Sequence, residues 1–442
     1  MVNSQNVKTS FFNLNWKLLP LKIHYFLTDC SNVPILSFLS TMSKQRGYSP
    51  FAVGIILTIS PLPSLVMRPL FGAIVDKYKC PKLALMTTIV IGFMTVCALM
   101  LMPGPVVYGK IDDDVVFRTP LFWLYLTTIV IFHTTISIRG MVEDTICVNL
   151  LGDDKHKYGE QRVWGSVGWG TISIISGACV DWFSKGQKHK NYLPCFITSL
   201  TLYALDFYDV SKIKIVQKQE NSIIKTDLKK LFMTLFTTYK VLIFIFWIII
   251  LGFFDSFIMY FYFWYLEDLS NIYHPETKPW IKTIQGLTLT IQCFGGNFPF
   301  FYLSSFILKR VKAEYVVSSV FLTFAVRFFL YSVIENPFWV LPVEFLNGIT
   351  FALALSTIIS YMCRSAPTGI EATVMGIIYT ALYGIGVPIG SFVGGYLFNR
   401  FGSIFSFKIL SGMAVTSCVL HIVVTQLTNR LSKPKNSEEE AR

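Results

Sequence analysis

Apolar and polar residues alternate along this chain in long blocks. Apolar stretches recur, each about as long as the roughly 20 residues that a helix needs to cross the hydrocarbon core of a bilayer. Short polar segments separate them, with little sign of strand alternation. The pattern therefore predicts twelve membrane-spanning helices, at residues 17–43, 50–71, 81–103, 120–148, 161–182, 192–209, 240–266, 283–308, 313–334, 338–362, 371–398 and 404–427.

A polar, lysine-rich stretch at 210–239 divides the predicted helices into two sets of six. The residues that end the fifth helix, Gly177 to Phe183, are echoed by Gly395 to Phe401 at the end of the eleventh. The expected fold class is thus an all-α membrane protein with twelve transmembrane helices in two pseudo-symmetric six-helix bundles. The expected domains are a cytoplasmic N-terminus (1–16), an N-terminal bundle (17–209), a cytoplasmic linker (210–239), a C-terminal bundle (240–427) and a cytoplasmic tail (428–442).

Composition supports the membrane interpretation. Of the 442 residues, 53% are hydrophobic and only 14% are charged, whereas soluble domains carry about 25% charged residues. The net charge of +12 is concentrated in loops that a twelve-helix topology places on the same side as both termini. Basic loops face the cytoplasm, so we expect both termini to be cytoplasmic. The sequence leaves open whether the membrane is the plasma membrane or an internal one.

The sequence offers little for other chemistries. The nine cysteines form no Cys-x-x-Cys pair or Cys/His ligand spacing, so neither zinc nor a disulfide framework is predicted. No nucleophile and base are paired by motif, and we expect neither an enzyme nor a cofactor. The expected partners are a small-molecule substrate, the lipid bilayer and a coupling proton. No nucleic acid is expected, and the protein should be a monomer.

The loop after the second predicted helix reads Arg68-Pro-Leu-Phe-Gly72-Ala-Ile-Val-Asp76-Lys77. It resembles the loop signature of the major facilitator superfamily, although Lys79 replaces the second glycine of that signature. The resemblance implies the major facilitator fold and secondary transport by alternating access. It also implies that Gly72, Asp76 and Lys77 form a gating motif.

The run from Tyr158 to Trp169 resembles a segment of bacterial transporters of the lactose permease type, which are oligosaccharide/proton symporters. This resemblance implies a sugar-binding role for Arg162 and Trp169, with Ser166 at a nearby cysteine position. It assigns the acidic partner on the fourth helix to Asp144, with Glu143 beside it. The other interpretation is a structural salt bridge between the fourth and fifth helices, with Trp169 simply packed.

Further segments, 263–269, 335–344 and 348–352, resemble animal proteins similar to major facilitator superfamily domain-containing protein 6. On the first helix, Asp29 and Asn32 are three residues apart and should share one face. A charge facing lipid is costly, so this face should point inward. It can contact a substrate or a cation, or clasp a neighbouring helix.

In the second half, the ionisable residues within apolar segments are Asp255, Arg327 and Glu344. Asp255 and Arg327 match coupling positions of the lactose permease type, and Glu344 is the natural carboxylate to load a proton opposite Arg327. A permanent Glu344–Arg327 salt bridge is the alternative.

The sequence thus favours a secondary active transporter for a small polar solute. A sugar is the first expectation and a nucleoside the second, with proton coupling left open. The alternative from another class is a transport-inactive membrane receptor or scaffold with the same fold.

Overall fold

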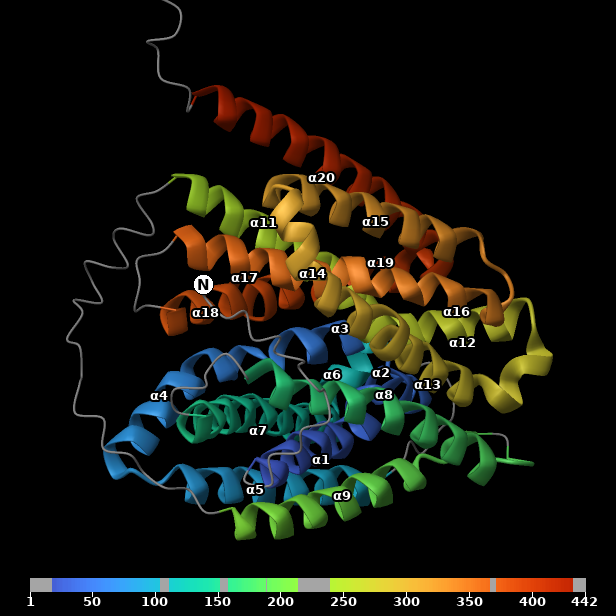
Figure 1. Cartoon of the computed structure of the whole chain (residues 1–442). Helices are drawn as coiled ribbons and strands as arrows, with labels where there is room; N and C mark the ends of the chain where they lie inside the picture. Colours follow the sequence, from blue (N-terminus) through green and yellow to red (C-terminus); the bar gives the residue numbers. More distant parts are fainter. Residues whose placement is uncertain are drawn as a thin grey trace, which may run out of the picture.

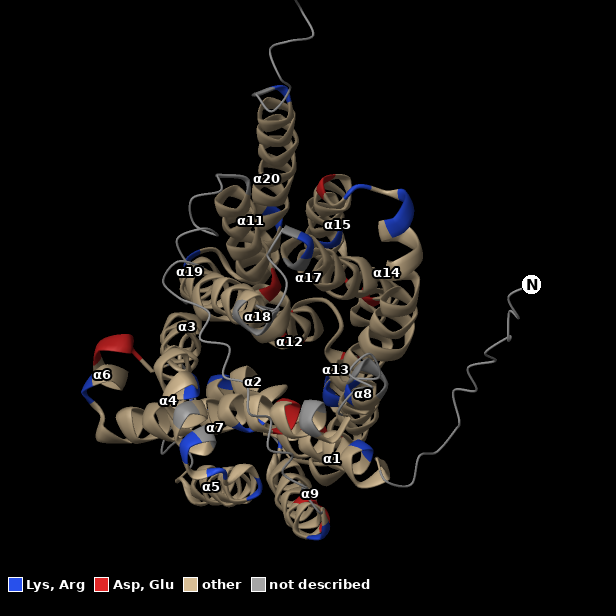
Figure 2. Ribbon diagram, turned by 60° about the vertical axis from the view of Figure 1, so that its left-hand side comes forward, with Lys and Arg blue, Asp and Glu red and all other residues tan. Residues whose placement is uncertain are grey.

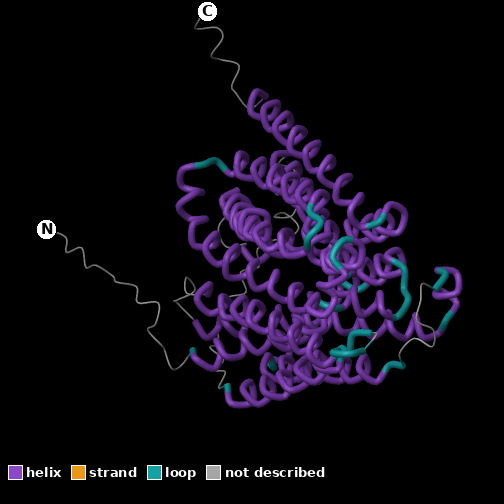
Figure 3. Tube along the Cα trace, turned by 90° about the vertical axis from the view of Figure 1, so that its right-hand side faces the viewer, coloured by secondary structure: helices purple, strands orange, loops and turns teal. Residues whose placement is uncertain are grey.

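A computed structural model describes residues 18–103, 111–151, 158–187, 189–213, 239–365 and 371–431. Within these ranges the chain is helical throughout, with short turns and no strands (Figure 3). The linker predicted at 210–239 and both predicted terminal segments lie largely outside the described residues, and residues 104–110 lie wholly outside them.

The described residues of the first half form nine helices, drawn in blue to green in Figure 1. They are α1 (Leu19–Leu36), α2 (Leu39–Gln45), α3 (Pro50–Ile59), α4 (Leu62–Tyr78), α5 (Pro81–Leu101), α6 (Asp113–Arg118), α7 (Pro120–Leu151), α8 (Tyr158–Phe183) and α9 (Leu193–Lys212).

The second half has more breaks. Its elements are α11 (Tyr239–Ser256), η2 (Phe257–Phe261), α12 (Tyr262–Ile272), η3 (Pro275–Trp280), α13 (Ile281–Ile291), η4 (Gln292–Asn297), α14 (Phe298–Arg310), α15 (Ala313–Val333), η5 (Pro337–Trp339), α16 (Val340–Val343), η6 (Glu344–Leu346), η7 (Gly348–Leu353), α17 (Ala354–Ser365), α18 (Glu371–Tyr379), η8 (Thr380–Gly386), α19 (Val387–Phe401) and α20 (Ser403–Leu431).

Each predicted apolar segment coincides with one of these helices or with a consecutive set of them, and the all-helical fold class is confirmed. Within the described ranges, nine helices are long and apolar enough by themselves to cross a membrane. The helices at the first, sixth and eighth predicted segments fall outside that group, and they carry buried charged residues such as His24, Asp206 and Lys282. Elsewhere most of the helix surface carries neither acidic nor basic residues (Figure 2).

Four long helices of the second half contain a π-helical turn: η2, η4, η7 and η8. Such turns arise where one extra residue is inserted into a helix, and they are frequent at functional sites. Two of them pack together, because Gly296 of η4 lies against the backbone of Gly348 in η7. The hydrophobic periodicity does not predict these breaks.

The most extensive contacts between the two halves of the chain are those of α3 with α19 and of α8 with α13. In the first pair the backbones nearly touch. A Cβ atom placed on Gly54 would lie 2.8 Å from the Cα of Gly395. Small residues allow membrane helices to approach this closely.

Polar contacts between the halves cluster at one end of the bundle, where α2, α8 and α12 end and α13 begins; we call it the closed end. Lys44 contacts Asp268 there, and Asp181 accepts hydrogen bonds from Thr283. Nearer the middle, Thr58 donates to the carbonyl of Pro388 and Thr290 to that of Gly170. Between described residues, no hydrogen bond or ion pair joins the halves at the opposite end.

The contact at Gly54 leads to a first prediction. Gly54→Ala should lower stability by about 1–3 kcal/mol, because the added methyl group overpacks two backbones. Thermal unfolding in detergent measures this. Gly412→Ala is the matched control, since no atom lies within 4 Å of a Cβ placed there, and it should be neutral or stabilising. Equal melting temperatures for the two variants would contradict the close packing.

Candidate functional site

Arg162 of α8 and Asp29 of α1 form an ion pair between the first and fifth predicted transmembrane helices. Arg162 Nη1 donates to Asp29 Oδ2 over 3.1 Å. The guanidinium also lies over the ring of Tyr25, 5.4 Å from its centroid. The arginine side chain is 42% exposed and the aspartate 14%. This pair is therefore within reach of a solute entering between the helices.

Asp144 of α7 lies beside this pair. Its Oδ1 accepts a hydrogen bond of 2.9 Å from the hydroxyl group of Tyr25, the residue whose ring supports Arg162. Two tyrosines of the other half, Tyr379 and Tyr383, interact electrostatically with Arg162, and Tyr379 does so with Asp144 as well. Groups from both halves thus surround Arg162.

The structure separates two residues that the sequence grouped with this site. Glu143 contacts His24 of α1, with 3.3 Å between Oε2 and Nε2. Asn32 accepts a hydrogen bond of 2.5 Å from Tyr203 of α9 and is buried. Asp29 and Asn32 both face the interior of the protein but contact different helices, α8 and α9, and the contact of this face with a solute remains a prediction. Asn32 clasps α1 to α9.

Ser166 and Trp169 lie on α8 after Arg162. Ser166 is half-buried and one helical turn further along, on the same side as Arg162. Trp169 packs against a small apolar cluster that includes Cys30 and Val33 of α1. Packing of the indole fits the structural interpretation of Trp169 and leaves its contact with a solute a prediction.

A buried set of charges joins α1, α7 and α9. We call His24, Arg139, Glu143 and Asp206 the N-half charge cluster. His24 Nδ1 is 2.6 Å from Asp206 Oδ1, and Arg139 Nη2 donates to the other oxygen of the same carboxylate. All four residues are at most 2% exposed. Sequence reasoning missed Asp206; an acidic residue within an apolar segment was the available signal.

A second buried set surrounds Arg327 of α15. Its guanidinium donates to Glu344 Oε2 over 2.5 Å, to Asn347 Oδ1 over 2.8 Å and to Thr350 Oγ1 over 3.0 Å. Tyr331 donates to the other oxygen of Glu344 over 2.5 Å. We call these residues, with Gln292, the C-half network. The structure brings together the predicted pair Arg327 and Glu344.

Asp255, the third predicted coupling residue, lies on α11 and is half-buried. It interacts electrostatically with Arg327 and with Tyr383. No hydrogen bond or ion pair within the described part of the chain joins Asp255 to the C-half network.

A third set of charges crosses between the halves at the closed end. We call Lys44, Glu267, Asp268 and Lys282 the inter-half ion cluster. Lys44 Nζ lies 2.7 Å from Asp268 and 3.3 Å from Glu267. Glu267 also pairs with Lys282, which is fully buried and lies over the rings of Phe38 and Tyr192. None of these four was singled out from the sequence.

The predicted gating motif lies on α4 at the other end of the bundle. The side chain of Asp76 is outside the described residues. Lys77 is exposed and lies 5.5 Å from the ring centroid of Tyr78. A Cβ on Gly72 would meet Met141 at an ordinary 3.6 Å, so close helix packing does not require this glycine.

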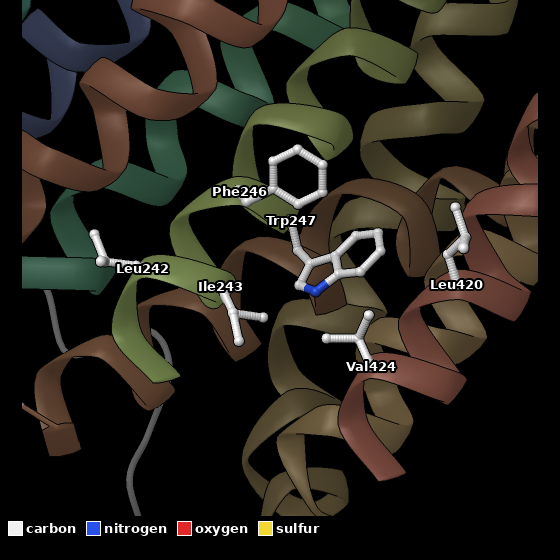
Figure 4. Close-up of a pocket in the computed structure, with 6 residues that line it drawn as sticks. All are labelled: Leu242, Ile243, Phe246, Trp247, Leu420 and Val424. Atoms are coloured by element: carbon white, nitrogen blue, oxygen red, sulfur yellow. The ribbon is translucent and has the colours of Figure 1, made fainter. Parts of the chain in front are cut away.

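A separate apolar groove of about 400 Å³ lies between α11 and α20 (Figure 4). Its lining residues are Leu242, Ile243, Phe246, Trp247, Leu420 and Val424. The groove has almost no polar surface, as expected of a surface that faces lipid. None of its lining residues belongs to the charged sites described above.

Comparison of the sequence and the structure with known proteins identifies the family. A model of the family described as the MFS_1 like family matches residues 18–409, nearly the whole chain. The chain belongs to the MFS_1 like family.

This MFS_1 like chain is similar to the uncharacterized transporter YwbF of Bacillus subtilis (strain 168). The two are 23% identical over 394 residues, which cover 88% of this chain and 87% of the relative. Among solved structures, the nucleoside transporter NupG has a TM-score of 0.76 at 17% identity, covering 93% of this chain and 99% of its own. A D-xylose-proton symporter has a TM-score of 0.68 at 13% identity, covering 92% and 97%. At these identities the likeness shows the major facilitator fold.

The inter-half ion cluster leads to a second prediction. Glu267→Gln leaves the fully buried Lys282 without its carboxylate, which should cost about 3–5 kcal/mol. Asp268→Asn is the matched control, because Asp268 is 24% exposed and its one ion pair among the described residues is with Lys44. A partly exposed pair contributes about 0–1 kcal/mol. Unfolding of both variants in detergent measures the difference, and a Glu267→Gln variant no less stable than Asp268→Asn would refute the role of Lys282.

Proposed function

We propose that this protein is a secondary active transporter that moves a small polar solute by alternating access. The observation that carries the proposal is the partly exposed Arg162–Asp29 pair, which lies among groups from both halves of the chain. Ionisable residues within membrane segments usually mark a substrate or ion pathway. A transporter that binds its solute between two halves has such groups at their interface.

The position of the closed end supports alternating access. The inter-half ion cluster and the α3–α19 contact hold the two halves together on one side. With both termini in the cytoplasm, this side faces away from the cytoplasm, and the solute enters or leaves on the cytoplasmic side in this conformation. The cytoplasmic gate of Gly72, Asp76 and Lys77 remains a prediction.

Sugar-like solutes are the first candidate class. Arg162, Asp29 and Asp144 can hold neighbouring hydroxyl groups through charge-assisted hydrogen bonds. The resemblance of the run from Tyr158 to Trp169 to the lactose permease type and the D-xylose-proton symporter among the fold neighbours favour this class. A nucleoside also presents a set of hydroxyl groups, and the fold neighbour NupG supports it as the second candidate.

An uptake screen tests the proposal. The purified chain in proteoliposomes is offered radiolabelled xylose, lactose, uridine and adenosine, with and without a pH gradient. Uptake of at least one solute above that of empty liposomes is expected. Absence of uptake across sugars and nucleosides, with a correctly folded protein, would favour the alternative of a transport-inactive receptor or scaffold.

Arg162→Lys should reduce uptake by about tenfold or more. Lysine keeps the positive charge but loses the planar fork that holds two oxygens at once, and a hydrogen bond to a charged group contributes about 1.5–3 kcal/mol. Initial uptake rates of the solute found in the screen measure the effect. Arg118→Lys, at an exposed position of α6, is the control. If Arg162→Lys takes up the solute at the wild-type rate, Arg162 does not bind two oxygens of the solute at once.

For the C-half network, we propose a permanent Glu344–Arg327 bridge, with the coupling role of Glu344, Arg327 and Asp255 as the alternative. Both oxygens of Glu344 accept hydrogen bonds, and Arg327 is fully buried. Glu344→Gln should therefore cost about 3–5 kcal/mol, since an unpaired charge stays buried. Unfolding in detergent measures this loss. A stable variant that exchanges solute but no longer accumulates it under a pH gradient would instead make Glu344 the coupling residue.

A further inference from the structure

The N-half charge cluster contains an ion pair that lacks hydrogen bonds. His24 Nε2 and Glu143 Oε2 are 3.3 Å apart, yet neither atom has a hydrogen-bond partner among the described residues, and both are buried. In the C-half network, by contrast, both oxygens of Glu344 accept hydrogen bonds. A buried polar atom without a partner is costly, so the arrangement around His24 and Glu143 requires an explanation.

The charge balance of the N-half charge cluster explains the arrangement of His24 and Glu143. Arg139 is a single permanent cation that faces two carboxylates, Asp206 and Glu143. One additional proton, on the imidazole or on a carboxylate, makes the cluster neutral. Uncompensated charge at membrane depth costs several kcal/mol, so the buried cluster favours one bound proton. Histidine is the side chain best suited to gain and lose a proton near neutral pH.

We propose that His24 and Glu143 form a proton-binding site in the N-terminal half, whose occupancy changes as the two halves open and close. A proton moves from water to His24 Nε2, which faces Glu143 Oε2, and returns to water, with no other bond made or broken. The site differs from the C-half network in position and in every residue. Its use in transport rests on the proposed function; its ability to bind a proton does not.

Charged and titratable groups face the site from each neighbouring helix. On α9 they are Asp206 and, one turn further toward the helix end, Asp209, which interacts electrostatically with His24. Asp209 Oδ2 is buried and has no hydrogen-bond partner among the described residues. It thus supplies an intermediate proton acceptor between His24 and the end of α9 at Lys212.

The remaining groups connect the site with the solute site. On α7, Arg139 binds Asp206 and lies over the ring of Tyr203. On α1, the charge of Asp29 interacts with that of Glu143 and of Arg162, the latter on α8. His24 and Tyr25 are neighbours on α1, and they contact the neighbouring residues Glu143 and Asp144 of α7.

These neighbours make the two sites mechanically dependent. A solute that engages Arg162 changes its pairing with Asp29 and its contact with Tyr25, and α1 transmits this change to His24, one residue away. Because binding linkage is reciprocal, a proton at His24 changes the affinity for the solute in turn. This linkage between solute binding and proton binding does not involve the C-half network.

The first experiment observes the proton directly, without a solute. Histidine ring nitrogens are labelled with ¹⁵N in the full chain in lipid nanodiscs, and their NMR signals are followed from about pH 6 to about pH 10, where a carboxylate-paired histidine titrates. His24→Gln assigns the signal. We expect the His24 ring to pass from charged to neutral within this range. A single charge state throughout would overturn the proposal.

Variants then test the partner. In Glu143→Gln the ratio of charged to neutral His24 should fall about tenfold, which is one unit of proton affinity. Glu143→Asp keeps the charge, so the ratio should fall less in this variant. If Glu143→Gln does not fold, the ratio in Glu143→Asp is the test. His133→Gln is the control, because His133 lies on the same helix without a carboxylate partner among the described residues. An unchanged ratio in both Glu143 variants would overturn the proposal.

A second measurement tests the link to opening. Spin labels at the exposed positions Lys185 and Lys278, on the two halves at the closed end, report the separation there. The population with separated labels should change with pH in the wild type and in His133→Gln, but not in His24→Gln. A pH response that persists in His24→Gln would exclude this site as its origin. Because no solute is used, a failed uptake screen leaves both results interpretable.

Discussion

The structure depends on one constraint: a charge inside the membrane must lie against an opposite charge. Among the described residues, three clusters of charges hold together the helices that carry them, in addition to the Arg162–Asp29 pair between α1 and α8. The N-half charge cluster joins α1, α7 and α9, and the C-half network joins α15 to η4 and η6. The inter-half ion cluster joins α2 to α12 and α13. Lipid tails are as apolar as the side chains, so burial of apolar surface does not by itself favour one helix neighbour over another, whereas pairing of charges does.

The three clusters differ in what they can do. Within each half, the charges are almost fully buried and fix the helices of one bundle relative to each other. The inter-half ion cluster is partly exposed at Lys44 and Glu267, so water can replace these contacts when the halves separate. The glycine contact between α3 and α19 adds an interface that can slide or part at little cost in side-chain rearrangement. The helices within each bundle are thus fixed relative to one another, whereas the contacts between the two bundles can be broken and formed again.

The helices could be predicted from the sequence because an apolar run of spanning length has few alternatives. The π-helical turns η4 and η7 could not, since one inserted residue hardly alters an apolar run. Arg162 was predicted in the site with Asp144, and with Glu143 beside it; in the structure Arg162 pairs with Asp29, and Glu143 contacts His24. Choosing among three nearby carboxylates requires the relative rotation of three helices, which no local pattern encodes. Lys282 was missed because a lysine near a predicted helix end ordinarily reaches water.

The most direct test of alternating access is whether the surroundings of Arg162 can be reached from each side of the membrane. Ser166→Cys, one turn from Arg162, is introduced into a chain whose native cysteines are replaced, and is labelled with a membrane-impermeant thiol reagent added to one face of the membrane at a time. The account predicts labelling from the cytoplasmic face in this chain, and labelling from the opposite face once Glu267→Gln weakens the closed end. Labelling from neither face, or from the same single face in both chains, would contradict alternating access around Arg162.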